Sequence, residues 1–163
     1  MTGSSQFTPK IDIPLHPVAQ ARILYADTDK MGIVYHASYL RYLELARVEL
    51  IRGAGLPYTV MEDAGLALPL IELGVAFRSP GLYDDRITVH VGLSRVTRVR
   101  VHFQYRVVVE PGDRPARSDG VPNERSIELL LAETRHCCMS MHRGRPARLP
   151  DAWYVQLADH VGR

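Results

Sequence analysis

The chain has 163 residues, a formal net charge of +2 and an apolar content of 46%. This length predicts one domain, spanning residues 1–163, with a substantial buried core. Bulk nucleic-acid binding usually needs a strong basic excess, and a membrane-spanning helix needs about 20 consecutive apolar residues. The sequence shows neither feature, so we expect no nucleic-acid partner and no membrane insertion.

The cysteines and the N-terminal residues indicate the compartment. Cys137 and Cys138 are sequence neighbours, which makes a mutual disulfide sterically awkward, whereas small secreted domains usually carry well-spaced cysteine pairs. Residues 1–10 lack the charged-then-apolar pattern of a secretory signal. Together these features favour a cytoplasmic protein.

The first third of the chain predicts an extension, a strand and one long helix. Residues 1–17 are polar and contain three prolines, so we expect a surface extension. Residues 18–26 alternate imperfectly and predict a strand, and the turn at residues 27–32 follows. Residues 37–52 predict a helix that Gly53 and Gly55 end. Apolar residues recur at helical spacing along this helix at Leu40, Leu43, Ala46, Leu50 and Ile51.

The predicted helix is apolar over most of its circumference, because Leu45 and Val48 widen the apolar stripe. Such helices are normally buried by neighbours on several sides. Glu44 lies within this apolar surface, and we expect it to pair with Arg47 or Arg41.

The rest of the chain is rich in strands. Residues 56–67 predict a short second helix, and strands are expected at 68–77, 86–93, 98–109 and 126–141. A long surface loop at 110–123 and a short tail from residue 151 complete the order. Consecutive strands after one helix predict an α+β design with an antiparallel sheet.

The strand at 98–109 has two distinct faces. Its apolar face carries valine and aromatic side chains, and the opposite face carries Arg98, Arg100, His102, Gln104 and Arg106. In a monomer we expect this polar face to meet water, and in a dimer it could meet a partner or a ligand.

The most informative segment joins the first strand to the helix. Its turn holds Asp27, Asp29 and Gly32, and His36 follows where the helix is expected to begin. A helix start offers unpaired N–H groups and a partial positive charge. A carboxylate beside such donors can attack a carbonyl or activate a water while the donors hold the oxyanion. This combination predicts acyl transfer or hydrolysis.

Two motifs in this chain resemble one known family. The first is Tyr25-x-Asp27-Thr28-Asp29-x-x-Gly32-Ile33-Val34-Tyr35-His36-x-x-Tyr39 followed by Leu43-Glu44-x-Ala46-Arg47, and the second is Phe77-Arg78-x-Pro80-x-x-Tyr83-Asp84-Asp85. They resemble the 4-hydroxybenzoyl-CoA thioesterase family of hot-dog-fold acyl-CoA thioesterases, and are most similar to its Tol-Pal-associated branch. The resemblance implies a curved antiparallel sheet of about five strands wrapped around one long helix. It also implies a homodimer, often paired into a homotetramer, with active sites at the subunit interface and no metal or organic cofactor.

The resemblance assigns roles to single residues. Asp29 matches the family's catalytic carboxylate, and His36 matches the position whose backbone N–H polarises the thioester carbonyl. The chain departs from the family's pattern at Lys30 and Met31, where small residues are common, and in its enlarged loop at 110–123. Neither departure touches Asp29 or His36. Asp27 is expected only to shape the turn.

Other residues are candidate substrate contacts. Tyr35 and Tyr39 lie near the expected site, although aromatic residues at a strand–helix junction are mostly core. Arg78, Arg98 and Arg100 could bind the CoA phosphates, or they could form a solvated strand face. The histidines and cysteines show no recognised metal-ligand spacing, so no metal site is expected.

The sequence therefore predicts an acyl-CoA thioesterase that cleaves a thioester to a free acid and CoA, with Asp29 as nucleophile or general base. Two alternatives remain at this point. One is an enoyl-thioester hydratase on the same fold, and the other is a non-catalytic acyl-CoA-binding or scaffold protein. The residues do not identify the acyl group, nor whether CoA or a carrier protein holds it.

Overall fold

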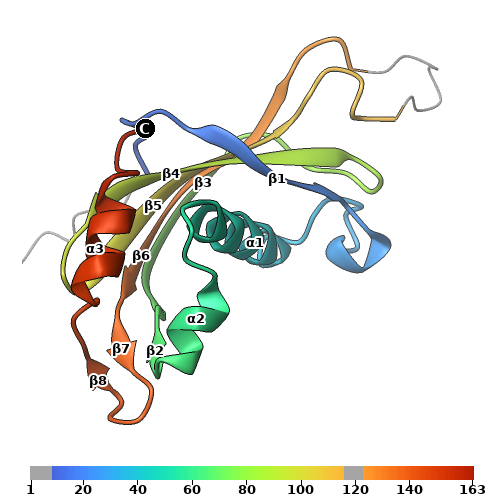
Figure 1. Cartoon of the computed structure of the whole chain (residues 1–163). Coiled ribbons are helices and arrows are strands. Elements are labelled where there is room, and N and C mark those ends of the chain that lie inside the picture. The colour runs from blue at the N-terminus through green and yellow to red at the C-terminus, as the bar shows by residue number, and fades with distance from the viewer. Residues whose placement is uncertain (1–8, 116–122) are drawn as a thin grey trace, which may run out of the picture.

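A curved antiparallel sheet wraps around one long helix in the computed structural model, which describes residues 9–115 and 123–163 (Figure 1). Five strands form this sheet in the order β1-β4-β5-β6-β3, and all neighbouring strands are antiparallel. They are β1 (His16–Arg22), β3 (Leu70–Phe77), β4 (Arg86–Val96), β5 (Arg100–Val109) and β6 (Ile127–Cys137). This architecture confirms the expected α+β hot-dog fold.

The long helix α1 (Ser38–Gly53) lies in the hollow of the sheet, close to its predicted range (Figure 1). Gly55, with φ at +83°, follows the helix, as expected for a residue that ends one. The remaining elements are a 3₁₀ turn (Tyr25–Asp27), α2 (Tyr58–Asp63), α3 (Asp151–Ala158) and a small sheet of β2 (Leu66–Ala67), β7 (Met139–Ser140) and β8 (Arg145–Pro146).

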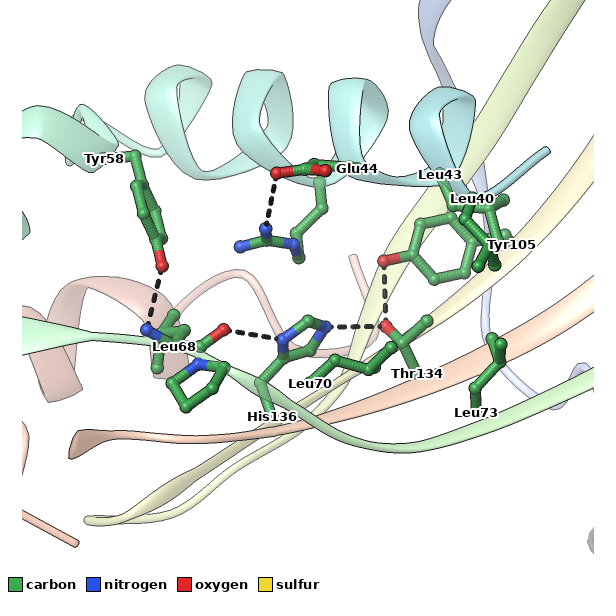
Figure 2. A pocket seen from close by; sticks show the side chains of 12 residues that line it. Leu40, Leu43, Glu44, Tyr58, Leu68, Leu70, Leu73, Tyr105, Thr134 and His136 are labelled. Carbon is green, nitrogen blue, oxygen red and sulfur yellow. Dashed lines mark hydrogen bonds and ion pairs between the residues drawn. The ribbon is translucent and has the colours of Figure 1, made fainter. Parts of the chain in front are cut away.

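The apolar face of β5 packs into the core as its alternation predicts. Val101, Phe103 and Tyr105 are at most 1% exposed and share one apolar cluster with Leu43 and Ala46 of α1. The helix is not enclosed on every side, however, because Leu40 and Leu45 remain about two-fifths exposed in the single chain. A cavity also remains between α1 and the sheet (Figure 2).

The opposite face of β5 meets water only in part, because Arg100 and Arg106 are exposed whereas His102 and Gln104 are buried. The N-terminal segment crosses the sheet at Gln104. The Gln104 side chain donates to the Asp12 carboxylate over 2.7 Å and accepts from the Asp12 backbone N–H over 3.1 Å. On the neighbouring strand, a Cβ at Gly92 would meet the backbone oxygen of Pro14 at 2.6 Å, so glycine permits this close crossing.

Several predicted boundaries were wrong, each for a tertiary reason. The first strand ends at Arg22 rather than at residue 26, and the last strand ends at Cys137, after which β7 leaves for the small sheet. The tail after residue 151 forms α3, which the sequence analysis missed. Its Leu157 is fully buried, and the Gln156 side chain donates to the Ala54 carbonyl over 2.7 Å. Contacts with the body of the protein therefore stabilise a short helix that local patterning did not predict.

Two predicted loops lie partly outside the described residues. Of the expected surface loop at 110–123, the structure describes residues 110–115 and 123, and of the expected extension at 1–17 it describes residues 9–17. No helix in the described ranges is both long enough and apolar enough to span a membrane.

Candidate active site

The two carboxylates of the turn before α1 have different environments. Asp27 is only 2% exposed, and its carboxylate accepts from the Leu24 backbone N–H over 2.9 Å and from the Tyr42 hydroxyl over 2.6 Å. The Arg41 guanidinium pairs with the other Asp27 oxygen. Asp27 therefore ties the turn to α1, which agrees with its expected shaping role.

Asp29 is half-buried and less restrained. Its Oδ1 accepts from the Met31 backbone N–H over 2.8 Å, and its backbone carbonyl accepts from the Gly32 N–H over 2.9 Å. Gly32 has φ at +75°, which glycine adopts without strain. No described residue donates a hydrogen bond to Asp29 Oδ2. One carboxylate oxygen is thus held by the turn while the other stays available.

His36 lies just before the helix rather than at its first turn, because α1 begins at Ser38. The neighbouring N–H groups are used: Tyr35 donates to Asp27 over 2.8 Å and Ser38 donates to Tyr35 over 2.8 Å. No hydrogen bond within the described ranges takes up the His36 backbone N–H. A free donor of this kind can polarise a carbonyl.

Asp29 and His36 line the same groove, whose volume is about 500 Å³. Its walls come from the turn, the start of α1 and the connection between β3 and β4. The other lining residues are Met31, Ile33, Val34, Tyr39, Phe77, Arg78, Ser79 and Pro80. Four of the predicted site residues therefore meet here, namely Asp29, His36, Tyr39 and Arg78.

Tyr39 helps to fix the far wall of this groove. The side chain is 3% exposed, and its hydroxyl accepts from the Gly81 backbone N–H over 3.2 Å. Burial raises the pKa of Tyr39, so the hydroxyl stays protonated at neutral pH. A Cβ at Gly81 would lie 2.8 Å from the Tyr39 hydroxyl, so only glycine fits against this ring.

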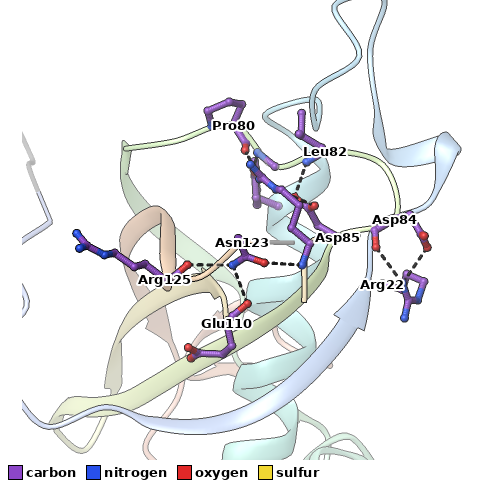
Figure 3. Close-up of polar contacts among 11 residues, drawn as sticks. Arg22, Pro80, Leu82, Asp84, Asp85, Glu110, Asn123 and Arg125 are labelled. Atoms are coloured by element: carbon purple, nitrogen blue, oxygen red, sulfur yellow. Dashed lines mark hydrogen bonds and ion pairs between the residues drawn. The ribbon is translucent and has the colours of Figure 1, made fainter. Parts of the chain in front are cut away.

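A buried ion pair of Asp85 supports the same connection, and Figure 3 shows Asp85 close to Pro80 and Leu82. Asp85 is fully buried and accepts from the Leu82 backbone N–H over 2.8 Å. The Arg114 guanidinium donates to both Asp85 oxygens, at 2.7–3.2 Å, and to the Pro80 carbonyl over 3.0 Å. Arg114 comes from the enlarged loop, so that loop holds the groove wall. Sequence reasoning missed this role because the contact spans 29 residues along the chain.

The remaining predicted contacts lie outside the groove in one copy of the chain. Tyr35 is exposed, with its ring centroid 4.3 Å from that of His36, and it does not line the groove. Arg98 pairs with Asp151 and lies over the Tyr154 ring at 4.1 Å. Arg100 is exposed on β5. Arg98 and Arg100 are therefore not brought to Asp29, because they lie by α3 and at the start of β5.

A second cavity of about 410 Å³ lies between α1 and strands β3, β5 and β6 (Figure 2). A chain of hydrogen bonds crosses its floor. Tyr105 and Thr134 are joined over 2.9 Å, Thr134 and His136 Nε2 over 3.0 Å, and His136 Nδ1 and the Leu68 carbonyl over 2.9 Å. The sequence analysis considered His136 only as a metal ligand and did not find this cavity.

The wall of this cavity contains a buried arginine. Arg47 is 7% exposed, its guanidinium lies over the Tyr58 ring at 5.2 Å, and its Nη2 lies 3.8 Å from a Glu44 oxygen. Glu44 pairs with Arg47, one of its two expected partners, but its side chain is 67% exposed. The sequence offered one signal for this wall, namely the charged residue Glu44 within the apolar surface of the helix.

Neither metal binding nor a cysteine nucleophile finds support in the described ranges. No three His, Cys, Asp or Glu side chains of those ranges are grouped so that they could hold a metal ion. Burial raises the pKa of the Cys138 thiol to about 11, so this thiol is protonated at neutral pH.

A long helix cradled by a curved antiparallel sheet is the architecture of the hot-dog fold. Residues 23–157 match the profile of the thioesterase-like superfamily, and the chain belongs to that family. The hypothetical protein TT1821 of Thermus thermophilus is 32% identical, with a TM-score of 0.74, and the match covers 89% of this chain and 99% of that chain.

Two relatives with named activities are also similar over most of their length. Acyl-CoA thioester hydrolase YbgC of Escherichia coli O6:H1 is 29% identical over 129 residues, which are 79% of this chain and 86% of the relative. The 1,4-dihydroxy-2-naphthoyl-CoA hydrolase of Thermosynechococcus vestitus is 28% identical over 138 residues, which are 82% of this chain and 85% of the relative. Both names describe thioester hydrolases, the enzyme class expected from the sequence.

Proposed function

We propose that this protein is an acyl-CoA thioesterase of the 4-hydroxybenzoyl-CoA thioesterase family, in its Tol-Pal-associated branch. Its substrate is an acyl-CoA, and its products are a free carboxylic acid and CoA. The observation that carries the proposal is the shared groove of Asp29 and His36, where one carboxylate oxygen and one backbone N–H have no partner among the described residues. The two motifs support this reaction and this branch, and the similarity to YbgC, named an acyl-CoA thioester hydrolase, supports the reaction.

The thioester carbonyl oxygen would accept from the His36 backbone N–H, which stabilises the negative charge that develops on that oxygen. Asp29 then acts in one of two ways. It attacks the carbonyl carbon, expels the CoA thiolate and leaves a mixed anhydride that water hydrolyses. Alternatively it takes a proton from a water, and the resulting hydroxide attacks while the thiolate leaves. Both routes require the free Asp29 oxygen and consume one water.

The active unit is proposed to be a homodimer or a homotetramer with active sites at the subunit interface. Strand β3 is an edge strand, and such edges invite pairing with another chain. Large apolar side chains are exposed along β3 and on the neighbouring face of α1, at Leu70, Ile71, Leu73, Phe77 and Leu40. Pairing of two copies through β3 would cover these side chains. Sedimentation analysis gives the oligomeric state, and a monomer at assay concentration would contradict this proposal.

The test is release of free CoA thiol from a panel of aliphatic and aromatic acyl-CoAs. We expect wild type to turn over at least one substrate and Asp29→Asn to lower kcat about 10³-fold or more, because Asn can neither attack nor take a proton. Asp84→Asn is the matched control, since Asp84 is a partly exposed carboxylate that pairs with Arg22 outside the groove. Equal activity of Asp29→Asn and wild type would exclude the proposed role of Asp29.

The chain would act as a non-catalytic acyl-CoA-binding protein if it bound a non-hydrolysable acyl-CoA analogue but turned over no substrate. This outcome would contradict the enzymatic proposal while leaving the fold and the groove intact.

A further inference from the structure

The cavity under the middle of α1 contains one charged group whose hydrogen-bonding capacity is not satisfied. Arg47 Nη1 is buried and has no hydrogen-bond partner among the described residues. The whole side chain is 92% buried. Burying an unpaired charge is costly, and buried polar groups are nearly always hydrogen-bonded. The guanidinium therefore indicates an occupant that supplies an oxygen acceptor.

The other polar groups on the cavity floor satisfy one another. The Leu68 carbonyl can only accept, so His136 carries its proton on Nδ1 and accepts at Nε2. Thr134 must then donate to His136, and Tyr105 must donate to Thr134. Figure 2 shows this series of hydrogen bonds through Tyr105, Thr134 and His136, in which every proton has one direction. Arg47 Nη1 remains as a charged donor without a partner among the described residues.

Glu44 does not neutralise Arg47 effectively. Their closest atoms lie 3.8 Å apart, beyond hydrogen-bond distance, and the Glu44 side chain is 67% exposed. Water screens a pair of this kind, so its contribution is small. A neutral acceptor would supply a hydrogen bond but no opposite charge. A carboxylate supplies both, and it matches the donors of a guanidinium.

The cavity has the size and lining of a small-molecule site. Its volume is about 410 Å³, and its walls are mainly apolar, with Leu40, Leu43, Leu68, Pro69, Leu70 and Leu73 around the polar floor. The cavity and the Asp29 groove are lined by residues of the same two elements, α1 and β3. Tyr39 and Phe77 line the groove, whereas the neighbouring Leu40 of α1 and Leu73 of β3 line the cavity.

We propose that this cavity binds the acyl part of the substrate and that Arg47 binds a carboxylate at the end of the acyl chain remote from the thioester. The preferred substrates are then ω-carboxyacyl-CoAs, the monothioesters of dicarboxylic acids. This inference rests on the proposed thioesterase function. It deepens that function by assigning Arg47 as a specificity-determining residue, while the chemistry at Asp29 stays the same.

The test compares hexanoyl-CoA, 6-hydroxyhexanoyl-CoA and adipoyl-CoA, which share a six-carbon acyl chain and differ at its far end. For wild type we expect kcat/KM for adipoyl-CoA to exceed that for hexanoyl-CoA by roughly 10- to 100-fold, the usual worth of a hydrogen bond to a charged group. In Arg47→Met this ratio should fall to about one or below, mainly through KM. Arg52→Met removes an exposed arginine of the same helix and should keep the wild-type ratio.

A second variant separates charge recognition from packing. Glu44→Gln keeps the volume and removes only a carboxylate that water already screens, so the preference for adipoyl-CoA should be kept or should rise slightly. Loss of the preference in Glu44→Gln would overturn the proposed ionic recognition by Arg47. If Arg47→Met fails to fold, two measurements still test the proposal: those on Glu44→Gln, and the wild-type ratio of kcat/KM for adipoyl-CoA to that for hexanoyl-CoA.

The remaining outcomes are equally decisive. Equal values of kcat/KM for 6-hydroxyhexanoyl-CoA and adipoyl-CoA would overturn the proposal that Arg47 recognises a carboxylate. Loss of the oligomer in Arg47→Met with an unchanged substrate ratio would assign the guanidinium to a subunit contact and overturn the proposal. Hydrolysis of hexanoyl-CoA that depends on Asp29, without a preference for adipoyl-CoA, would refute this inference alone. Absence of any turnover would instead refute the proposed function.

Discussion

The Asp29 groove and the Arg47 cavity are both lined by residues of α1 but are built in opposite ways. In the groove, a short turn presents a half-buried carboxylate and a backbone N–H, both with unused capacity. In the cavity, side chains from β5 and β6 satisfy one another and leave one buried charge. A reacting group needs access to substrate and water, whereas a recognition group gains strength from burial. The difference separates a region suited to chemistry from a region suited to selectivity.

The largest expected effect comes from Arg114, because this prediction tests whether the groove depends on a distant contact as well as on the turn that carries Asp29. Arg114→Met leaves the fully buried Asp85 carboxylate without its charge partner, and such losses cost about 3–5 kcal/mol of unfolding free energy. The groove wall at Pro80 also loses a hydrogen bond, so kcat should fall as well. Chemical denaturation and steady-state kinetics measure the two effects.

The matched control for this prediction is Arg86→Met, which removes an exposed arginine 3.5 Å from Asp113. It should cost less than about 1 kcal/mol, as exposed pairs usually do. Replacing both charges, in Asp85→Leu with Arg114→Met, should recover much of the lost stability. Equal effects of Arg114→Met and Arg86→Met would show that the enlarged loop does not support the groove.

The cavity should make stability depend on pH. Burial, the largest cause, lowers the pKa of His136 to about 4 from its ordinary value of 6.5. Above pH 6.5 His136 is neutral in both the folded and the unfolded state, and its contribution to the free energy of unfolding is fully present. As the pH falls from 6.5 toward 4, the unfolded chain binds a proton that the folded chain does not. About 3 kcal/mol of stability should therefore be lost across that window.

Urea denaturation of wild type and His136→Gln at pH 7 and pH 4.5 measures this loss. The variant should lose less stability than wild type between the two values, because Gln does not titrate. The exposed His16 on β1 provides the control, and His16→Gln should follow wild type. Parallel pH profiles for wild type and His136→Gln would contradict a buried neutral imidazole.

A smaller effect is expected from breaking the hydrogen-bond chain at its centre. Thr134→Val keeps the shape but leaves the Tyr105 hydroxyl and His136 Nε2 without their partner, at a cost of about 1–3 kcal/mol. Thr88→Val in β4 should cost less, since Thr88 accepts only a long bond of 3.3 Å from Gln20. Thermal unfolding compares the two variants. A larger loss for Thr88→Val would mean that the cavity floor is not a coupled network.

The smallest effects come from two glycines. Gly81→Ala places a methyl 2.8 Å from the Tyr39 hydroxyl, so the groove wall must shift, at a cost of about 1–3 kcal/mol and some activity. Gly53→Ala lies at the end of α1 with open space around it and should stabilise the fold by up to about 1 kcal/mol. Thermal unfolding and thiol release would test both, and unchanged kinetics in Gly81→Ala would show that this contact does not position the groove.

The sequence by itself determined the central helix, the succession of the main strands along the chain and the turn that carries Asp29 and His36, because these depend on periodicity and on residues close together in the sequence. The core face of β5 followed from simple alternation and is buried as expected. The position of His36 was predicted to within two residues of the start of α1.

Only the tertiary structure decided the rest. The N-terminal segment bonds to Gln104, α3 packs through Leu157, and Arg114 reaches Asp85 across the chain. The Arg47 cavity likewise forms where α1 meets β5 and β6. No local pattern encodes these contacts, because each depends on which surfaces the folded sheet brings within a few ångströms of each other and removes from water.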